Sequence, residues 1–447
     1  MHPLLLSREG SDRATAYNIS NRIVRCGARL FTGWLDAPAT PGGQTRARLG
    51  VHDAITGALL RTDLLGEAED NHCSPTLALD PDGRLHAIIG SHGHAFHYRY
   101  ALDPADPDAT RWSPPEPLGP SDTYPSLIAD ATGTLHLLSR ACGERWSLLY
   151  RRKRPGAPWE PARALAVSPV AGYNNFMATI STGPDGRTLH VLLQFHHGTP
   201  ESGAAADCRG RLAAYLYSGD SGKTWLDDRG APCGLPLTTD TVRPFLRPAQ
   251  PGLRISNHVV DACGCPWVFT TLPGNRAGAL FRRDAAGSWQ EIDTRDTLGT
   301  LGFHGGHGRE VSLSRDAAGC IHLVAATNPD GTSAAWYDPR HELFHLVLDE
   351  TTGASLSFAQ ITGTDPSVAH WLPALENWDW ARSSGESGAR GAGAVGGGCC
   401  QDAPWLLHTR GRNLGGIDGD NSNTLCTEVY LTALRDVNQR RVNSGSR

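Results

Sequence analysis

Short stretches in which apolar and polar residues alternate recur along this chain of 447 residues, and tight-turn sequences separate them. The clearest example covers residues 71–94, where the turn sequence Asp-Pro-Asp-Gly at 80–83 lies between two apolar segments. An Asp-Gly turn between such segments predicts a β-hairpin. His72 and His92 lie at the open ends of this hairpin, far from the turn. We therefore expect the hairpin to be a scaffold unit whose open ends carry the chemistry.

The hairpin pattern repeats with a period near fifty residues. Turn glycines followed by an apolar segment recur at intervals of 50 to 78 residues. Residues 19–24 (Ile-Ser-Asn-Arg-Ile-Val) also parallel residues 255–260 (Ile-Ser-Asn-His-Val-Val). A period of this length with strand-turn-strand content predicts a β-propeller. The turn glycines are Gly27 in a degenerate first copy, then Gly83, Gly133, Gly186, Gly264 and Gly319.

A second marker follows the third predicted strand of several repeats. The sequence from Ser218 to Trp225 matches Ser-x-Asp-x-Gly-x-x-Trp, the Asp-box of sialidase-like propellers. Degenerate relatives end at Trp112, Trp159 and Trp289. The Asp and Gly of such a box shape a turn, and the Trp is expected to pack between outer strands. The box is a marker of fold and carries no information on catalysis.

These repeats predict an all-β protein, a seven-bladed β-propeller of four-stranded antiparallel blades. Residues 370–375 and 404–408 are expected in the seventh blade. Residues 428–434 are expected to pair with the first blade, because open strand edges are costly. We expect one propeller domain over residues 1–436. Residues 383–402, rich in Gly, Ser and Ala, predict a flexible insert, and residues 437–447 a disordered tail.

The amino-acid composition and charge exclude some classes of function. The hydrophobic content of 39% and the charged content of 19% are typical of a soluble globular protein. A formal net charge of −5 gives no electrostatic reason to expect nucleic acid as a partner, and no apolar run is long enough to span a membrane. The apolar start is too short for a signal peptide, so we expect an intracellular protein or one whose leader has been removed. The eleven scattered cysteines predict mostly free thiols.

Register within the repeat separates structural histidines from candidate functional ones. One histidine lies three residues after the turn glycine in several repeats, or four residues after it where one residue is inserted. The same residue at one register of four blades predicts a packing or hydrogen-bonding role. These histidines are His86, His136, His190 and His322.

The open strand ends, in contrast, differ from repeat to repeat. Arg140 stands where other repeats have Gly, Gln or Ala, and His92 stands where others have Cys, His or Asn. A scaffold needs no such variety, so these ends indicate a functional site near the central channel. His72, His92, Tyr124 and Arg140 should converge there from two neighbouring blades.

Four short sequences at these ends make a family resemblance specific: Asn71-His72, Ser91-His92, Tyr124 and Ser139-Arg140. The chain resembles the β-propeller polysaccharide lyases of the ulvan lyase type, within the wider group of propellers with Asp-box (BNR) repeats. The resemblance implies that two His, a Tyr and an Arg cleave a uronate-containing polymer by β-elimination. It also implies an acidic polysaccharide or oligosaccharide as partner, sulfated in the ulvan-like case. We expect the protein to act as a monomer.

The residue types suit this chemistry. Removing the proton next to a uronate carboxylate places further negative charge on that group, and the guanidinium of Arg140 pairs bidentately with a carboxylate. Tyr124 is suited to take the C5 proton and to return a proton to the leaving 4-oxygen. Either His72 or His92 would neutralise charge or act as a second base, because imidazole transfers protons near neutral pH.

Binding and metal sites are expected around this centre. Polar residues at other strand ends are candidates for contacts to sugar hydroxyls or sulfate: Asn71, Tyr173, Asn174, Asn175, His258, His307 and Arg309. Thiolate and imidazole together suit zinc. A structural zinc would be held by Cys142, His196, His197 and Cys208. The elimination itself requires no metal.

Two alternatives remain at this level. A sialidase-like glycoside hydrolase would use an arginine triad, for which Arg22, Arg140 and Arg309 are available. A non-catalytic carbohydrate-binding propeller would need aromatic stacking platforms, which Trp371, Trp378 and Trp380 would supply. Loss of turnover with retained binding after a change at Tyr124 would separate a lyase from a binding protein.

Overall fold

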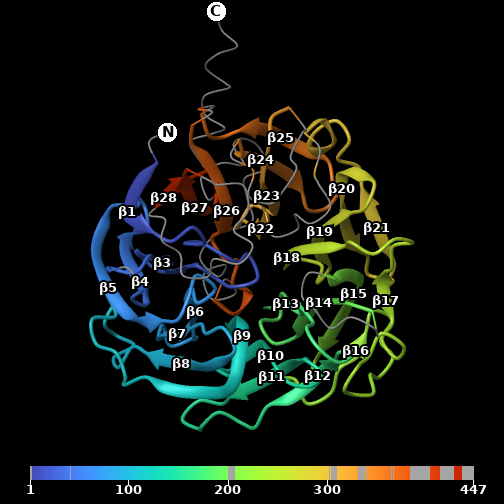
Figure 1. Ribbon diagram of the computed structural model, residues 1–447, viewed down its shortest axis with the longest axis horizontal. Coiled ribbons are helices and arrows are strands. Elements are labelled where there is room, and N and C mark those ends of the chain that lie inside the picture. The colour runs from blue at the N-terminus through green and yellow to red at the C-terminus, as the bar shows by residue number, and fades with distance from the viewer. Residues whose placement is uncertain are drawn as a thin grey trace, which may run out of the picture.

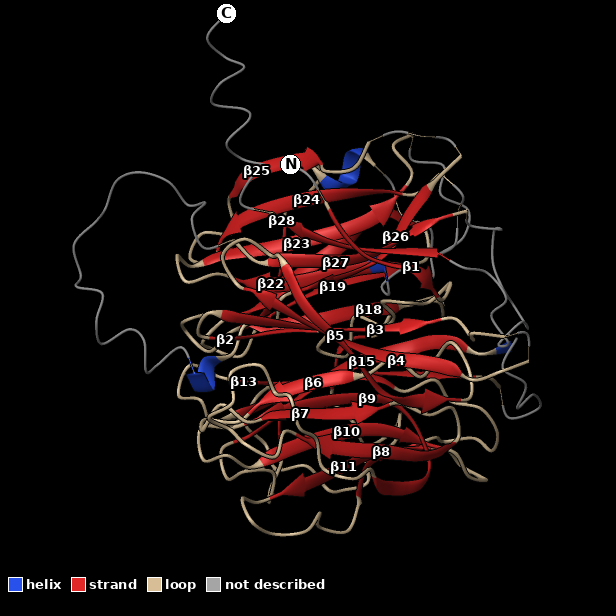
Figure 2. Cartoon of the chain, turned by 90° about the vertical axis from the view of Figure 1, so that its left-hand side faces the viewer, coloured by secondary structure: helices blue, strands red, loops and turns tan. Residues whose placement is uncertain are grey.

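Almost every ordered element of the molecule is a β-strand (Figure 2). The structure is a computed structural model that describes residues 3–40, 42–199, 207–301, 303, 310–330, 338, 340–363, 365, 367–382, 403–412 and 427–434. Within these ranges no helix is long and apolar enough to cross a membrane. The predicted insert 383–402 and tail 437–447, together with His307 and Arg309, lie outside the described residues.

The described strands form five antiparallel sheets. The eight-stranded sheet contains both ends of the chain, in the order β26-β27-β28-β1-β3-β4-β5 with β2 paired to β3. The bounds of its strands are β1 (Leu4–Gly10), β2 (Ile23–Cys26), β3 (Arg29–Asp36), β4 (Thr45–Asp53), β5 (Leu59–Ala68), β26 (Ala369–Leu375), β27 (Trp405–Gly411) and β28 (Thr427–Ala433).

The other four sheets follow in chain order around a common centre (Figure 1). The seven-stranded sheet contains β6 (Thr76–Leu79), β7 (Leu85–Ile89), β8 (His94–Tyr100), β9 (Glu116–Ala129), β10 (Leu135–Ala141), β11 (Ser147–Lys153) and β12 (Arg163–Val167). The five-stranded sheet contains β13 (Met177–Thr182), β14 (Leu189–His197), β15 (Arg209–Ser218), β16 (Leu226–Asp227) and β17 (Pro244–Leu246). The two four-stranded sheets contain β18 (Arg254–Val260), β19 (Pro266–Leu272), β20 (Asn275–Arg283) and β21 (Trp289–Ile292), and then β22 (Val311–Arg315), β23 (Cys320–Thr327), β24 (Glu342–Asp349) and β25 (Ser355–Gln360).

The first and last described strands pair with each other. Strands β1 and β28 run antiparallel, with Leu4 opposite Leu431 and Leu5 opposite Tyr430. The final described strand thus pairs with a strand at the start of the chain. The pairing satisfies backbone groups that would otherwise be exposed at a sheet edge.

The hydrophobic core lies between neighbouring sheets. Leu49 of β4 and Leu77 of β6 belong to one buried cluster, which joins the eight-stranded and seven-stranded sheets. Trp267 of β19 and Leu323 of β23 belong to another cluster, which joins the two four-stranded sheets. Alternating strand residues therefore supply the interfaces between sheets, as the sequence pattern predicts.

The four register-matched histidines are structural, as predicted. The ring of His136 lies between the turn carboxylate of Asp130, at 3.1 Å, and the hydroxyl of Tyr150 on the next strand, at 2.7 Å. His86 bridges Asp80 and Tyr98 in the same way. Equivalent contacts join His190 to Tyr215, and His322 to Asp316 and His345. Each ring thus ties the hairpin to its neighbouring strand.

The Asp-box extends this unit to the next repeat. Trp225 packs edge-on against Tyr150, with ring centroids 5.3 Å apart. Within the box, the carboxylate of Asp220 accepts hydrogen bonds from the main-chain N–H groups of Lys223 and Thr224. The box therefore stabilises its own turn and places a tryptophan against the preceding unit, which is a role in the fold.

A segment after β26 covers the turn-bearing ends of several sheets. The guanidinium of Arg382 donates to the carbonyl of Asp80, and the indole N–H of Trp380 donates to the carbonyl of Val260. The guanidinium of Arg315 stacks on the rings of Trp378 and Trp380, 4.9 Å and 4.5 Å from their centroids. This segment lies at the strand ends opposite those of His72 and His92.

Candidate active site

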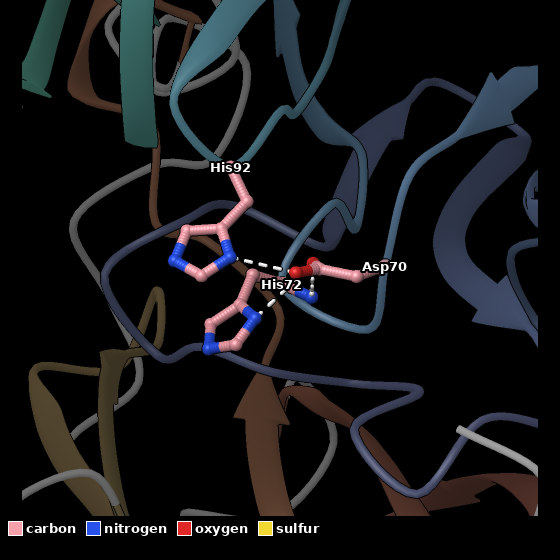
Figure 3. A group of neighbouring side chains, drawn as sticks. All are labelled: Asp70, His72 and His92. Atoms are coloured by element: carbon pink, nitrogen blue, oxygen red, sulfur yellow. Dashed lines mark hydrogen bonds and ion pairs between the residues drawn. The ribbon is translucent and has the colours of Figure 1, made fainter. Parts of the chain in front are cut away.

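Asp70, His72 and His92 form a compact group at the open end of the first full hairpin (Figure 3). Asp70 and His72 lie just before β6, and His92 lies just after β7. The Asp70 carboxylate accepts hydrogen bonds from Nδ1 of His92 at 2.6 Å and from Nδ1 of His72 at 3.1 Å. The two imidazoles stack with centroids 4.1 Å apart. A single carboxylate therefore orients both rings.

Burial and hydrogen bonding set the charges of this group. Burial lowers the pKa of His72 to about 3, although the hydrogen bond to Asp70 acts in the opposite direction. Burial alone would raise the pKa of Asp70, but the hydrogen bonds from His72 and His92 hold it below its usual range. Near neutral pH, Asp70 is therefore ionised and His72 is neutral.

Arg13 and Tyr17 reach the same place from the segment between β1 and β2. Arg13 donates from Nη1 to the Tyr17 hydroxyl at 2.8 Å and also contacts Nε2 of His72. Tyr17 packs edge-on against Tyr124, with centroids 5.3 Å apart. Sequence reasoning missed both residues, because they precede the degenerate first repeat and lie outside the register that singled out the other candidates.

Tyr124 lies within β9 in an unusual backbone conformation, with φ of 60°. The pairing of β9 with β10 shifts between Leu138 and Arg140, so an extra residue of β9 is accommodated opposite Ser139. A bulge of this kind redirects side chains, and a bulky residue at positive φ is strained. Strain of this type is concentrated at functional sites. The backbone conformation is consistent with the prediction that Tyr124 belongs to the site.

Arg140 is a fully buried cation enclosed by aromatic rings. Its guanidinium carbon lies 4.4 Å from the centroid of Tyr124, 4.6 Å from that of Trp146 and 5.2 Å from that of Tyr173. Nη1 donates to the Tyr173 hydroxyl at 3.1 Å, but Nε and Nη2 have no hydrogen-bond partner among the described residues. Burial alone would lower the pKa of Arg140, whereas the phenols of Tyr173 and Tyr124 raise it. The site thus holds a charged group with two unused donors.

The predicted catalytic residues therefore converge. His72 and Tyr124 have ring centroids 6.2 Å apart, and Arg140 joins the same contact network by stacking on Tyr124. The structure brings His72, His92, Tyr124 and Arg140 into one group, from the strand ends at which the repeats differ. Their roles stay predictions.

The predicted binding residues are placed less uniformly. Tyr173 lies beside Arg140. Asn71 is buried and donates from Nδ2 to the carboxylate of Asp12 at 2.9 Å. His258 is also buried, and its two ring nitrogens contact the hydroxyls of Thr179 and Ser181. Both ring nitrogens of His258 thus have internal partners, whereas Oδ1 of Asn71 has no hydrogen-bond partner among the described residues and stays a candidate for a ligand contact.

Two further members of that set, Asn174 and Asn175, are buried at the entrance to β13. Asn174 accepts a hydrogen bond from the main-chain N–H of His196 at 3.3 Å. Nδ2 of Asn174 and Oδ1 of Asn175 have no hydrogen-bond partner in the part of the chain that the structure describes. They remain candidates for ligand contacts.

The predicted zinc ligands do not form one group. Within the described residues, the only cluster of three or more potential metal ligands is Asp70, His72 and His92. His196 contacts Arg254, Nδ1 of His197 bonds to the carbonyl of Gly198, and the Cys208 thiol donates to the carbonyl of Tyr173. Neither Cys142 nor Cys208 is part of a disulfide. Zinc binding by Cys142, His196, His197 and Cys208 stays a prediction.

The residues that favoured the alternatives have other partners. Both terminal nitrogens of Arg22 donate to main-chain carbonyls, those of Pro75 and Ala16. Trp371 is buried and donates to the carbonyl of Asp12. Trp378 and Trp380 stack with Arg315. Neither an arginine triad that includes Arg22 nor a tryptophan platform is supported.

Comparison with known proteins adds the family. The model of the BNR repeat-containing family matches residues 44–297, more than half of the chain. The chain belongs to the BNR repeat-containing family. Residues of this chain are also 22% identical over 225 positions to an ulvan lyase of Alteromonas sp. (strain LOR). That alignment covers 45% of this chain and 46% of the relative, so the match spans about half the length of the relative.

Solved structures of polysaccharide lyases are similar to this protein over nearly its whole length. A PL25 ulvan lyase superposes with a TM-score of 0.65 at 13% identity, covering 98% of this chain and 99% of that one. A structure described as the same kind of lyase bound to -[GlcA(1-4)Rha3S]- gives 0.64 at 13% identity, with the same coverage. The polysaccharide lyase Uly1 gives 0.59 at 13% identity, covering 97% and 99%. At this identity the likeness establishes the fold.

Proposed function

We propose that this protein is a polysaccharide lyase that cleaves a uronate-containing polysaccharide by β-elimination. The observation that carries the proposal is Arg140, whose buried guanidinium lies against Tyr124 with Nε and Nη2 unpartnered among the described residues. A buried cation without a counter-charge is costly, so its retention suits an anionic ligand. The similarity to an ulvan lyase supports the same class of reaction.

The proposed reaction assigns each group a step. Arg140 pairs with the uronate carboxylate and stabilises the charge that develops as the C5 proton is lost. Tyr124, acting as the phenolate, takes that proton onto its oxygen; the C5–H electron pair forms the C4=C5 double bond as the C4–O4 bond breaks. The departing O4 takes a proton from Tyr124, which suits a syn elimination. His92, oriented by Asp70, lies beside the reacting carbons as a second base.

The proposed substrate is an acidic, ulvan-like polymer. The relative bound to -[GlcA(1-4)Rha3S]- supports a sulfated uronate polysaccharide as the first candidate.

We also propose that the fold has seven blades, obtained by dividing the eight-stranded sheet between β1 and β3 and the seven-stranded sheet within β9. No metal is needed in this reaction. A zinc held by Cys142 and its predicted partners would be structural, and metal analysis of the purified protein tests it.

Ultraviolet absorbance during incubation with uronate polysaccharides tests the proposed function. Ulvan comes first, followed by glucuronan, heparinoids and pectins. Elimination leaves a conjugated 4,5-unsaturated uronate that absorbs, whereas hydrolysis leaves none. We expect absorbance to rise with the wild type, and Tyr124→Phe to reduce kcat by about 1,000-fold or more with binding retained. New reducing ends without a rise in absorbance would instead indicate a hydrolase. If the wild type produced neither absorbance nor new reducing ends, the proposal would be contradicted for these substrates.

A further inference from the structure

The hydrogen-bond partners of His72 determine where its ring proton lies. Nδ1 is 3.1 Å from the ionised carboxylate of Asp70, which only accepts, so Nδ1 carries the proton (Figure 3). Nε2 contacts the guanidinium of Arg13, which only donates, so Nε2 carries a lone pair. Two partners of opposite kind thus hold His72 in one neutral tautomer.

His92 shares the carboxylate but lacks the second constraint. Its Nδ1 donates to the other oxygen of Asp70 at 2.6 Å, which directs the lone pair to Nε2. Nε2 of His92 makes no hydrogen bond to the described residues, and the His92 side chain is 28% exposed against 9% for His72. The lone pair of His72 is occupied by Arg13, whereas that of His92 is accessible.

We propose that Arg13 is a positioning residue that fixes His72 as the neutral, Nδ1-protonated tautomer, so that Asp70 and His72 support His92 as the imidazole that meets the substrate. Arg13 acts through His72. The Tyr17 hydroxyl accepts a hydrogen bond from the same guanidinium nitrogen, and the Tyr17 ring packs against Tyr124, so Arg13 also helps to position the proposed base. The role of His92 in a reaction rests on the proposed lyase function. The tautomer of His72 does not depend on that function.

The same contact argues against a metal at this place. Two imidazoles and a carboxylate are a suitable donor set for a transition metal. Metal binding through Nδ1 of His72 would move the ring proton to Nε2, which faces the positively charged guanidinium of Arg13. Arg13 therefore keeps Asp70, His72 and His92 as a hydrogen-bonded relay.

The charged and titratable groups around His72 define what removal of Arg13 does. They are Asp70 from the same segment, His92 after β7, Arg13 and Tyr17 from the segment after β1, and Tyr124 of β9. Arg13 disfavours the protonated ring by charge repulsion, and Asp70 favours it. Without Arg13, protonation of His72 at Nε2 becomes easier, while Nδ1 still donates to Asp70.

Ring nitrogen and carbon NMR of the full chain tests the tautomer directly. In the wild type we expect His72 to be protonated at Nδ1 and not to titrate above about pH 5. Arg13→Gln should raise the titration midpoint of His72 by about one pH unit, and Arg13→Lys should restore part of the wild-type behaviour. Arg154→Gln, a change at an arginine whose side chain is 68% exposed, is the matched control and should leave His72 unchanged. A wild-type His72 protonated at Nε2, or a midpoint unaffected by Arg13→Gln, would overturn the proposal.

Kinetics then separates positioning from stability. On a substrate that the wild type cleaves, Arg13→Gln should lower kcat by about 10-fold or more with little change in KM, and Arg13→Lys should recover part of that loss. If Arg13→Gln and Arg13→Lys lowered activity equally, and each lowered the melting temperature of the protein in proportion to its loss of activity, the role of Arg13 would be purely structural. That result would overturn the proposal. The NMR measurement needs no turnover. A wild type without lyase activity would therefore contradict the proposed function, while the NMR spectra would still show which tautomer His72 adopts.

Discussion

Arg140 shows at the scale of one residue how the proposed binding site opposes stability. The guanidinium is fully buried, and two of its nitrogens have no hydrogen-bond partner among the described residues. Stacking on Tyr124, Trp146 and Tyr173 offsets part of the desolvation cost. Under the proposed function, the uronate carboxylate offsets the remaining cost, which is the condition for a strong electrostatic contribution to catalysis.

Replacement of Arg140 by Met should therefore stabilise the protein and inactivate it. Met fills a similar volume without a buried charge, so we expect the free energy of unfolding to rise by about 1 kcal/mol or more. The value of kcat/KM should fall by about 100-fold or more. Urea denaturation and the absorbance assay measure the two effects.

Arg151→Met is the matched control for this change. Arg151 is also buried, but it pairs with Asp122 at 3.1 Å. Its loss leaves a buried carboxylate unpaired and should destabilise the protein by about 3 kcal/mol. If Arg140→Met destabilised the fold as much as Arg151→Met does, Arg140 would be a structural ion and not a site held for a ligand.

At the scale of the structural element, each hairpin combines a repeated frame with a variable open end. In the β9–β10 hairpin the frame is the contact of His136 with Asp130 and Tyr150, close to the turn. The variable end carries Tyr124 and Arg140, where the strand pairing bulges. Under the proposed function, a histidine close to the turn, such as His136, serves the fold, and a histidine at the open end, such as His92, serves the reaction.

His136→Ala and His92→Ala should separate these purposes. Removing His136 leaves the buried Tyr150 hydroxyl and Asp130 without their ring partner, so we expect a loss of about 1–3 kcal/mol in stability and unchanged kcat. Removing His92, whose ring is partly exposed, should change stability little and reduce kcat by about 100-fold. Urea denaturation and kinetics on the same preparations measure both. Loss of activity in His136→Ala at a temperature where it is fully folded would contradict the division.

The hairpin register makes much of this element predictable from the sequence. The turn glycines locate the strands, and the position relative to the glycine is enough to separate His136 from Arg140. The same reasoning places His72, His92, Tyr124 and Arg140 at one end. It does not find Arg13 or Tyr17, because their contacts to His72 and Tyr124 join segments far apart in the chain through sheet packing.

Binding roles are harder to predict than convergence. Asn71 and His258 lie at strand ends as expected, yet Asp12 accepts from Nδ2 of Asn71, and Thr179 and Ser181 contact both ring nitrogens of His258. A polar residue at a strand end looks the same in a sequence whether its partner is a ligand or a neighbouring strand. Only the packing of adjacent sheets decides between the two.

At the scale of the whole molecule, the candidate site depends on several sheets at once. Arg13 and Tyr17 belong to the segment after β1, Tyr124 and Arg140 to the seven-stranded sheet, and Tyr173 to the entrance of the five-stranded sheet. The pairing of β1 with β28 fixes the start of the chain to its end. A change that loosens the packing between sheets should therefore alter the site before the strands themselves are lost.

Buried neutral histidines make this packing sensitive to acid. Burial lowers the pKa of His258 to about 3 and that of His190 to about 4. In the unfolded chain a histidine has a pKa near 6.5, so below that pH the unfolded state binds more protons than the folded state does. Stability is therefore constant with respect to these groups above about pH 6.5 and falls as the pH drops toward 3 or 4. Burial lowers the pKa in the same way for His52, His72, His341 and His370.

We accordingly expect the free energy of unfolding to fall steeply between about pH 7 and pH 5. Each such histidine contributes up to about 1.4 kcal/mol per pH unit in this window. Urea denaturation at pH 5, 6 and 7 measures the slope, and the His258→Gln variant should reduce it by about one histidine's share, because glutamine keeps polar contact with Thr179 and Ser181 but does not titrate. A variant of an exposed basic residue, Arg8→Gln, should leave the slope unchanged. Stability that is level from pH 7 to pH 5 would mean that these rings are reached by water, and that the sheets pack less tightly around the centre than the buried clusters require.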